Sequence, residues 1–283
     1  MTKLTLSAYA KINLSLFITG KREDGYHTLE SVMQQISLCD TLEMEKIPEG
    51  IALSCNKVHL PTGEKNLCWK AASAYLSAAG ISGGVRIHLT KNVPDGAGLG
   101  GGSADAAAVL RGMTALYPAD VDLFAVGSKI GADVPFCLAG GTKLCQGIGE
   151  EMTDLPFLGK KNLFAVVAKN CEGLSTPHIY ALFDQGAGET KNPTTDRFCL
   201  ALSEGKTDKI FSLMHNDLEL CALSERPAIG ELKNRLLSLG ADAAMMTGSG
   251  SAVFGLFLSE EKARRAAQEL KKITEQSYFC TLL

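Results

Sequence analysis

A glycine-rich stretch over residues 94–105, PDGAGLGGGSAD, holds the residues best suited to chemistry in this sequence. Glycine tolerates positive φ angles and lets the backbone come close to a ligand, because it has no Cβ. The stretch leads into an Ala-rich segment, 106–117, which favours a helix. Backbone N–H groups and the positive end of the helix dipole converge at such a helix start and favour an anion. The sequence therefore predicts a phosphate cradle in a nucleotide-using enzyme.

Two commoner glycine motifs fit this stretch less well. A P-loop needs Gly-Lys-Ser or Gly-Lys-Thr after its glycines, and neither follows here. Gly96, Gly98 and Gly101 do satisfy the dinucleotide pattern G-x-G-x-x-G. Asp120 and Asp122 stand about where a ribose-binding acid is expected, but they open a helical segment instead of ending an apolar strand. A tight turn without ligand is the other alternative to the phosphate cradle.

A second group of polar side chains lies near the N-terminus. Positions 4, 6, 12, 14, 16 and 18 are apolar and predict a strand with one buried face. Lys11 and Asn13 share the opposite face, because side chains two residues apart in a strand point the same way. A cation beside an amide would suit a transferring phosphoryl group or an ionising hydroxyl. A solvated strand face would carry the same residues, and for an isolated lysine this alternative is favoured.

Acidic and hydroxyl side chains flank the expected helix ends. Asp133 stands between Gly131 and the pair Val134-Pro135, an arrangement typical of a helix N-cap followed by a proline. Taken alone, Asp133 is better interpreted as a structural cap than as a catalytic base. Ser103 could in the same way only cap the helix after the glycines, and Asp105 would stabilise that helix through its dipole.

The elements that must position these residues alternate between strands and helices. Asp24-Gly25 predicts a tight turn after the first strand. Further strands are expected at residues 26–42, 50–55, 85–90, 163–168, 241–246, 251–258 and 278–283. Helices are expected at 67–79, 106–117, 121–130, 177–183, 197–202, 206–213, 227–239 and after an N-cap at Ser259.

The length of 283 residues is large for one core and sufficient for two domains. Composition changes over residues 153–162, which predicts domains at 1–156 and 157–283. In the second domain, the order strand, helix, strand, strand, helix, strand matches a ferredoxin-like half. The fold class is therefore expected to be α+β.

Composition excludes several classes of function. The net charge is −3 and no basic stripe is present, so nucleic-acid binding has no support. The N-terminus lacks the apolar stretch of a signal peptide, and no run of residues is long enough to span a membrane. Nine cysteines are scattered without a C-x-x-C pair, which favours reduced thiols over a zinc site or disulfides. A cytoplasmic protein is expected.

Three stretches together resemble the signature motifs of one kinase superfamily. They are AYAKINL at 8–14, the glycine-rich stretch up to residue 108, and TGSGSAVF at 247–254. Their order and separations resemble those of the superfamily of galactokinase, homoserine kinase, mevalonate kinase and phosphomevalonate kinase. DGYH at 24–27, KNL at 65–67, GADVPF at 131–136 and STP at 175–177 extend the resemblance to one branch of it, which phosphorylates a cytidine-linked alcohol.

The resemblance implies a two-domain α+β kinase fold, with an N-terminal ribosomal-protein-S5-domain-2-like half and a C-terminal ferredoxin-like half. It implies ATP and Mg²⁺, and transfer of phosphate to the 2-hydroxyl of cytidine-linked methylerythritol in the non-mevalonate route to isoprenoid precursors. Lys11 would polarise the acceptor hydroxyl and steady the γ-phosphate, and Asp133 would be the general base. Phosphoryl transfer requires this kind of positioning and charge neutralisation more than covalent catalysis.

The resemblance also implies binding roles for residues along most of the chain. Substrate would be held by Asn13, Tyr26, His27, Thr176 and Tyr180, with the aromatic rings on the faces of cytosine and His27 at its edge. ATP would be held by Asn66, Lys91, Pro94, Asp95, Gly96, Ala97, Gly98, Leu99, Gly100, Gly101, Gly102 and Ser103. Ser103 would also stand near Mg²⁺, and Gly248, Ser249 and Gly250 would form a structural glycine motif.

Three other classes of protein are weaker interpretations. Kinases of the superfamily that act on homoserine or mevalonate lack the Gly-Tyr-His sequence that contains Tyr26 and His27. A non-catalytic nucleotide-binding protein of this fold would be expected to have lost Lys11 or Asp133, and both are present. A dinucleotide-dependent oxidoreductase is disfavoured by the expected order of strands and helices.

Overall fold

The computed structural model describes residues 3–156, 158, 162–188 and 192–283. The chain forms two compact units that interleave along the sequence. Unit 1 comprises Met1–Ala10, Cys39–Val93 and Gly100–Ala139, and unit 2 comprises Lys11–Leu38, Pro94–Leu99 and Gly140–Leu283. The expected domain boundary at 156 and 157 stays a prediction, because residue 157 lies outside the described residues.

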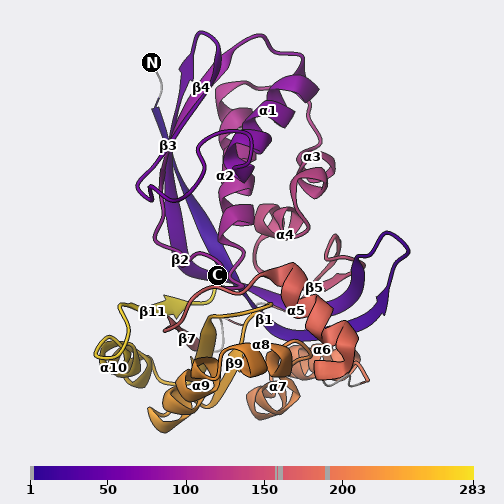
Figure 1. The fold of residues 1–283 in the computed structure, drawn as a ribbon, viewed down its shortest axis with the longest axis vertical. Helices are drawn as coiled ribbons and strands as arrows, with labels where there is room; N and C mark the ends of the chain where they lie inside the picture. The colour runs from indigo at the N-terminus through magenta and orange to yellow at the C-terminus, as the bar shows by residue number, and fades with distance from the viewer. Residues whose placement is uncertain (1–2, 157, 159–161, 189–191) are drawn as a thin grey trace. The chain divides into compact units, whose positions relative to one another are not determined.

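Unit 1 is a sheet with helices on one face (Figure 1). Its strands follow the order β3 (Gly50–Cys55), β4 (Gly84–Thr90), the last part of β2 (His27–Ile47) and the first part of β1 (Lys3–Lys21). Strand β4 runs antiparallel to β2 and parallel to β3. The helices are α1 (Leu67–Ala79), α2 (Gly101–Leu116), α3 (Leu123–Ile130) and α4 (Val134–Ala139).

Helix α2 lies in the core of unit 1. Its small side chains allow the neighbouring elements to pack closely around it. Ten of its residues are buried, and five of them in succession are Ala104, Asp105 and the three alanines at 106–108. Gly112 allows the sheet to approach, since a Cβ there would lie 2.7 Å from Leu6 Cδ1. This close packing holds α2 against the sheet.

Unit 2 contains a four-stranded antiparallel sheet. Its order is β11 (Gln276–Thr281), β7 (Phe164–Lys169), β10 (Val253–Phe257) and β9 (Ala243–Met246). Helices α9 (Ala228–Ser238) and α10 (Glu260–Leu270) pack against it. As expected, Ser259 caps α10 by accepting a hydrogen bond from Lys262 N, and the Ala263 and Leu270 side chains are buried. The expected ferredoxin-like half is thereby confirmed.

The remaining elements of unit 2 are shorter. They are β5 (Thr142–Gln146), β6 (Glu151–Asp154), β8 (His215–Asn216), α5 (Thr176–Leu182), a π-helical segment (Phe183–Ala187), α6 (Thr195–Glu204), α7 (Thr207–Leu213) and α8 (Glu219–Glu225). Strand β8 pairs in parallel with β1, with Ser15 opposite His215. In the part of the chain that the structure describes, every helix is too short or too polar to cross a membrane.

The alternative interpretation, in which the polar face of β1 is solvated, was wrong. Residues 10–18 of β1 are all buried, including Lys11, Asn13 and Ser15. The reason is that other segments of unit 2 cover this face: Ser31 hydrogen-bonds Asn13 Nδ2, and Thr247 hydrogen-bonds Asn13 N. Alternation along the strand identified the two faces but did not reveal that both are covered.

Candidate active site

The glycine-rich stretch forms a loop that opens a helix, as predicted. Gly96, Gly98 and Gly100 adopt positive φ angles of 56°, 73° and 67°. Gly100 is the N-cap of α2, so the helix begins earlier than expected, at Gly101. With this start Gly101 is helical and not left-handed, and Ser103 is the third helical residue, so the alternative in which Ser103 is the helix cap is excluded.

Within unit 2, the first part of this loop is held by two other segments. Lys169 Nζ donates to the carbonyl of Asp95 at 2.7 Å. Ala252 N donates to the carbonyl of Ala97 at 3.2 Å. A Cβ on Gly98 would overlap the carbonyl oxygen of Thr247, and a Cβ on Gly248 would lie 3.0 Å from the carbonyl oxygen of Gly98. The glycines at 98 and 248 therefore allow the two glycine-containing segments of unit 2 to pack backbone against backbone.

Lys11 and Asn13 form a buried pair in unit 2. Lys11 is 4% exposed, and its ammonium donates to Asn13 Oδ1 at 2.7 Å. The backbone N–H of Lys11 donates to the carbonyl of Leu99 in the glycine loop at 3.0 Å. The pair is thus anchored beside the loop, as a role in phosphoryl transfer requires. A lysine held in this way is not the solvated surface residue of the alternative interpretation.

Asp133 and Ser103 belong to unit 1. Asp133 immediately precedes α4, and its carbonyl accepts a hydrogen bond from Cys137 N at 3.0 Å, as the residue before a helix does. Ser103 Oγ would lie 3.7 Å from a Cβ on Gly131. Unit 1 therefore brings the Ser103 hydroxyl close to the segment that carries Asp133.

Lys91 lies in a buried ion cluster of unit 1. Its ammonium donates to Asp105 Oδ2 at 2.7 Å and also contacts Asp40 Oδ2. Asp40 Oδ1 accepts from Asn92 N and Val93 N at 2.6 and 2.8 Å. Although burial alone would lower the pKa of Lys91, the two carboxylates raise it above its ordinary value. The cluster joins β2, the residues after β4, and α2.

Asp105 is the member of this cluster whose hydrogen-bonding capacity is only partly used. Its Oδ1 atom is buried and has no hydrogen-bond partner among the described residues. Burial raises the pKa of Asp105 to about 7, against the attraction of Lys91 and with a further contribution from the Asp40 charge. The cluster lies under the first turn of α2, because a Cβ on Gly101 would lie 3.2 Å from Lys91 Nζ.

Asn66 has a structural function in unit 1. It is the N-cap of α1, where its Oδ1 accepts from Cys68 N at 2.8 Å, and its Nδ2 donates to the carbonyl of Pro61 at 2.7 Å. Gly102, an exposed residue of α2, would have a Cβ 3.5 Å from Leu67 Cδ1. Asn66 is therefore part of the helix start that lies beside the glycine-rich end of α2.

The aromatic residues expected to bind the base gather in unit 2. The rings of His27 and Tyr180 are stacked, while Tyr26 is 60% exposed. His27 Nε2 lies 2.7 Å from Asp184 Oδ1, and Lys21 Nζ donates to Asp184 Oδ2 at 2.6 Å. These hydrogen bonds from Lys21 and His27 lower the pKa of Asp184. Tyr26 is thus accessible and does not pack beneath the hairpin.

Thr176, the first residue of α5, is connected to the third signature motif, residues 247–254. Its Oγ1 lies 2.8 Å from Ser249 Oγ.

Sequence reasoning missed the residues that support the expected site. They are Asp40, Asp184, Asn216 and Thr247 in its supporting role. Each acts on residues far away in the sequence, so no local pattern distinguishes it from an ordinary polar residue.

The Ser103 hydroxyl would be the protein ligand of Mg²⁺ at this site. Mg²⁺ is commonly held by one or two protein oxygens together with water and substrate phosphates. The described residues contain no group of three or more His, Cys, Asp or Glu side chains able to hold a metal. The hydroxyl of Ser103, at the start of α2, is the protein oxygen that the glycine loop would place beside bound phosphates.

Comparison with known proteins identifies the class of this fold. The family model "GHMP kinases N terminal domain" matches residues 66–141, and "GHMP kinases C terminal" matches residues 201–275. A crystal structure of homoserine kinase from Cytophaga hutchinsonii superposes with a TM-score of 0.77 at 20% identity, covering 100% of this chain and 95% of that one. At that identity the likeness concerns the fold alone.

More similar relatives define the branch. 4-Diphosphocytidyl-2-C-methyl-D-erythritol kinases of Clostridium botulinum and Caldicellulosiruptor saccharolyticus are 43% and 41% identical over 95% and 98% of this chain, and 96% of each relative is covered. A crystal structure of 4-(cytidine 5′-diphospho)-2C-methyl-D-erythritol kinase superposes with a TM-score of 0.83 at 38% identity, covering 99% of both chains. The chain therefore belongs to the GHMP kinases, and within them to the 4-diphosphocytidyl-2-C-methyl-D-erythritol kinase family. It is a phosphotransferase.

Proposed function

We propose that this chain transfers the γ-phosphoryl group of ATP to the 2-hydroxyl of 4-diphosphocytidyl-2-C-methyl-D-erythritol, giving the 2-phosphate and ADP. The observation that carries the proposal is the glycine loop that opens α2 with Gly100 in the left-handed conformation. Membership of the family supplies the substrate, and the reaction belongs to the methylerythritol phosphate route to isoprenoid precursors.

The roles of the catalytic side chains follow from their chemistry. Asp133 accepts the proton of the acceptor hydroxyl, and Lys11 polarises that hydroxyl and neutralises charge on the transferring group. Because the acceptor is a tertiary alcohol, the proton is removed as transfer proceeds and not beforehand. Burial and the hydrogen bond to Asn13 support this role of Lys11, because they restrict the ammonium to few positions.

Binding roles are assigned to the surrounding residues. Residues 94–103 surround the phosphates, with Ser103 beside Mg²⁺, which supplies charge neutralisation when bound. Asn66 and Lys91 support the nucleotide from the helix starts of unit 1. Tyr26 and Tyr180 stack on cytosine, His27 binds its edge, and Asn13 and Thr176 orient the rest of the acceptor. Gly248, Ser249 and Gly250 brace the loop.

We also place the protein in the cytoplasm, with no nucleic-acid or membrane partner. The net charge of −3 provides no basic surface for nucleic acid. Burial raises the pKa of the Cys68 thiol, and it raises that of Cys280 to about 12. Such thiols are inert, which is typical of proteins that keep their cysteines reduced. We also propose that the boundary between the two domains lies near residues 156 and 157.

Product analysis tests the proposed function. The protein, ATP and Mg²⁺ are incubated with 4-diphosphocytidyl-2-C-methyl-D-erythritol, and the mixture is followed by ³¹P NMR. The proposal expects one new phosphomonoester signal and one ADP per substrate consumed, with the diphosphate linkage intact. Release of inorganic phosphate without a new ester, or cleavage of the diphosphate, would contradict it.

A further inference from the structure

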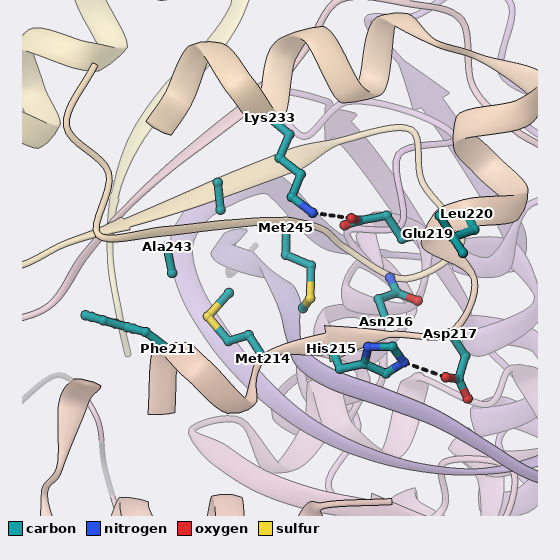
Figure 2. Close-up of a pocket in the computed structure, with 11 residues that line it drawn as sticks. Phe211, Met214, His215, Asn216, Asp217, Glu219, Leu220, Lys233, Ala243 and Met245 are labelled. Carbon is teal, nitrogen blue, oxygen red and sulfur yellow. Dashed lines mark hydrogen bonds and ion pairs between the residues drawn. The ribbon is translucent and has the colours of Figure 1, made fainter. Parts of the chain in front are cut away.

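The segment 215–219 of unit 2 connects β1 to the residues around the third signature motif, 247–254. On one side, β8 pairs with β1, and Asp217 Oδ2 accepts from Ile18 N at 2.7 Å. On the other side, Glu219 Oε2 accepts from Met246 N at 2.9 Å. Figure 2 shows Asn216, Asp217 and Glu219 at the wall of a cavity of roughly 250 Å³. None of these residues belongs to the three signature motifs.

Asn216 makes the central contact of this segment. It is 5% exposed, and its Nδ2 donates to the carbonyl oxygens of Met246 and Gly248 at 3.0 and 2.8 Å. Its Oδ1 accepts from Leu218 N at 3.0 Å. Both N–H groups and the oxygen of the amide are thus engaged, and the two carbonyls belong to the residues on either side of Thr247. The Asn216 amide therefore fixes the backbone around Thr247.

Thr247 connects this fixed backbone to the buried Lys11–Asn13 pair of β1. It is fully buried, and its Oγ1 accepts from Asn13 N at 3.0 Å. The same hydroxyl lies 3.2 Å from Asn13 Oδ1 and 3.3 Å from the carbonyl oxygen of Gly98, both of which can accept its proton. Asn13 Oδ1 also accepts from Lys11 Nζ at 2.7 Å. An unbroken series of contacts therefore runs from Asn216 to the Lys11 ammonium.

We propose that Asn216 is a positioning residue for phosphoryl transfer, acting on Lys11 through Thr247 and Asn13. The inference rests on the proposed role of Lys11. Displacement of a reacting group by about 1 Å can cost two orders of magnitude in rate. Replacement of Asn216 by Ala is therefore expected to lower kcat by about 10- to 100-fold, with a smaller change in KM for the cytidine-linked alcohol.

A double-mutant cycle tests this relation. Single-turnover rates are measured for the unaltered protein, Asn216→Ala, Lys11→Met and the double variant, since slow variants stay measurable in this way. The proposal expects Asn216→Ala to change the rate less than about 3-fold when Lys11 is already replaced. If the rate losses of the two single variants multiply in the double variant, the proposal is overturned, because Asn216 would then act by another route. An unchanged rate in Lys11→Met would instead overturn the role of Lys11 itself, and this inference with it.

Three further variants separate positioning from loss of stability. Thr247→Val removes the hydroxyl at nearly constant shape and is expected to reproduce the loss of rate, whereas Thr247→Ser is expected to restore it. Leu270→Ala, in the buried core of unit 2, serves as the control that lowers the melting temperature without touching this series. A similar loss of kcat in Leu270→Ala, or full activity of Thr247→Val, would overturn the proposal even where Asn216→Ala fails to fold.

Discussion

The imidazole of His27 stacks on the ring of Tyr180, with centroids 4.7 Å apart and an interplanar angle of 29°. The same imidazole also lies with Nε2 at 2.7 Å from Asp184 Oδ1. A carboxylate at Nε2 favours the tautomer that carries its proton on that nitrogen, which leaves Nδ1 as an acceptor. The 4-amino group of cytosine is a donor, and a His27 held in this tautomer suits it.

Replacement of Tyr26 by Ala tests the proposed base pocket. One aromatic stack on a base is worth about 1–3 kcal/mol, so KM for the cytidine-linked alcohol is expected to rise by roughly 5- to 150-fold. KM for ATP should change little. Because Tyr26 is 60% exposed, the melting temperature should stay nearly constant. An unchanged ratio of the two KM values would remove Tyr26 from the pocket.

Gly102 offers a clean test of the phosphate cradle. Gly101 is less suitable, since a Cβ there would press on Lys91 Nζ and Val93 Cγ1, both at 3.2 Å. At Gly102 the added methyl group would only make an ordinary contact with Leu67. Gly102→Ala should therefore preserve or raise stability, by up to about 1 kcal/mol, while weakening ATP binding about 10-fold or more.

Calorimetry measures this effect directly. Gly63→Ala is the matched control, because a Cβ on Gly63 meets nothing within 4 Å. The account expects the Gly63 variant to bind ATP normally. If the Gly102 variant is folded and binds ATP as tightly as the control, the phosphates do not approach this turn of α2.

The buried Asp105 predicts a pH dependence of stability. Its folded-state pKa of about 7 lies above the ordinary value of 3.8, so the folded protein binds this proton more tightly than the unfolded chain does. The free energy of unfolding contributed by Asp105 is therefore greatest below about pH 4 and falls as the pH rises towards 7. At about 1.4 kcal/mol per pKa unit, the fall is on the order of 4 kcal/mol.

Urea unfolding of the unaltered protein and Asp105→Asn between pH 4.5 and 8 checks this prediction. Asparagine cannot ionise, so the unaltered protein should lose stability relative to the variant as the pH rises through this range. A difference that does not depend on pH would show that Asp105 is ionised throughout.

Asp133→Asn separates the two roles considered for this residue. Asparagine caps a helix about as well as aspartate does, so the start of α4 and the melting temperature should be preserved. Loss of the general base should lower kcat by about 100-fold or more, with KM for both substrates little changed. Steady-state kinetics measures both effects. Turnover near that of the unaltered protein would restrict Asp133 to its structural role.

Local signals predicted much of the fold. The turn at Asp24-Gly25 and the cap at Ser259 depend on neighbouring residues, and both stand where they were expected. The glycine-rich stretch also predicted a helix, although α2 begins at Gly101 and so before the expected start. The short strands β5, β6 and β8 could not be predicted in this way, because two to five residues show no clear alternation. The stretch between the helices expected at 177–183 and 197–202 likewise contains part of the π-helical segment and the start of α6.

Contacts between distant residues account for most of what the sequence did not reveal. The burial of Lys11 results from segments more than 200 residues away, such as the one that contains Thr247. The Lys91 cluster joins carboxylates 51 and 14 residues away. The roles implied by the family resemblance for Lys11, Asp133 and the base-binding residues stay predictions for the experiments above.

The central claim is that the cytidine-linked alcohol is the acceptor, because that distinguishes this kinase from other GHMP kinases. ADP release is measured with ATP and four acceptors: 4-diphosphocytidyl-2-C-methyl-D-erythritol, free methylerythritol phosphate, homoserine and mevalonate. We predict a kcat/KM for the first that exceeds each of the others by about 100-fold or more, since binding of the remote base orients the reacting hydroxyl. Comparable kcat/KM values for methylerythritol phosphate, or faster turnover of homoserine or mevalonate, would contradict it.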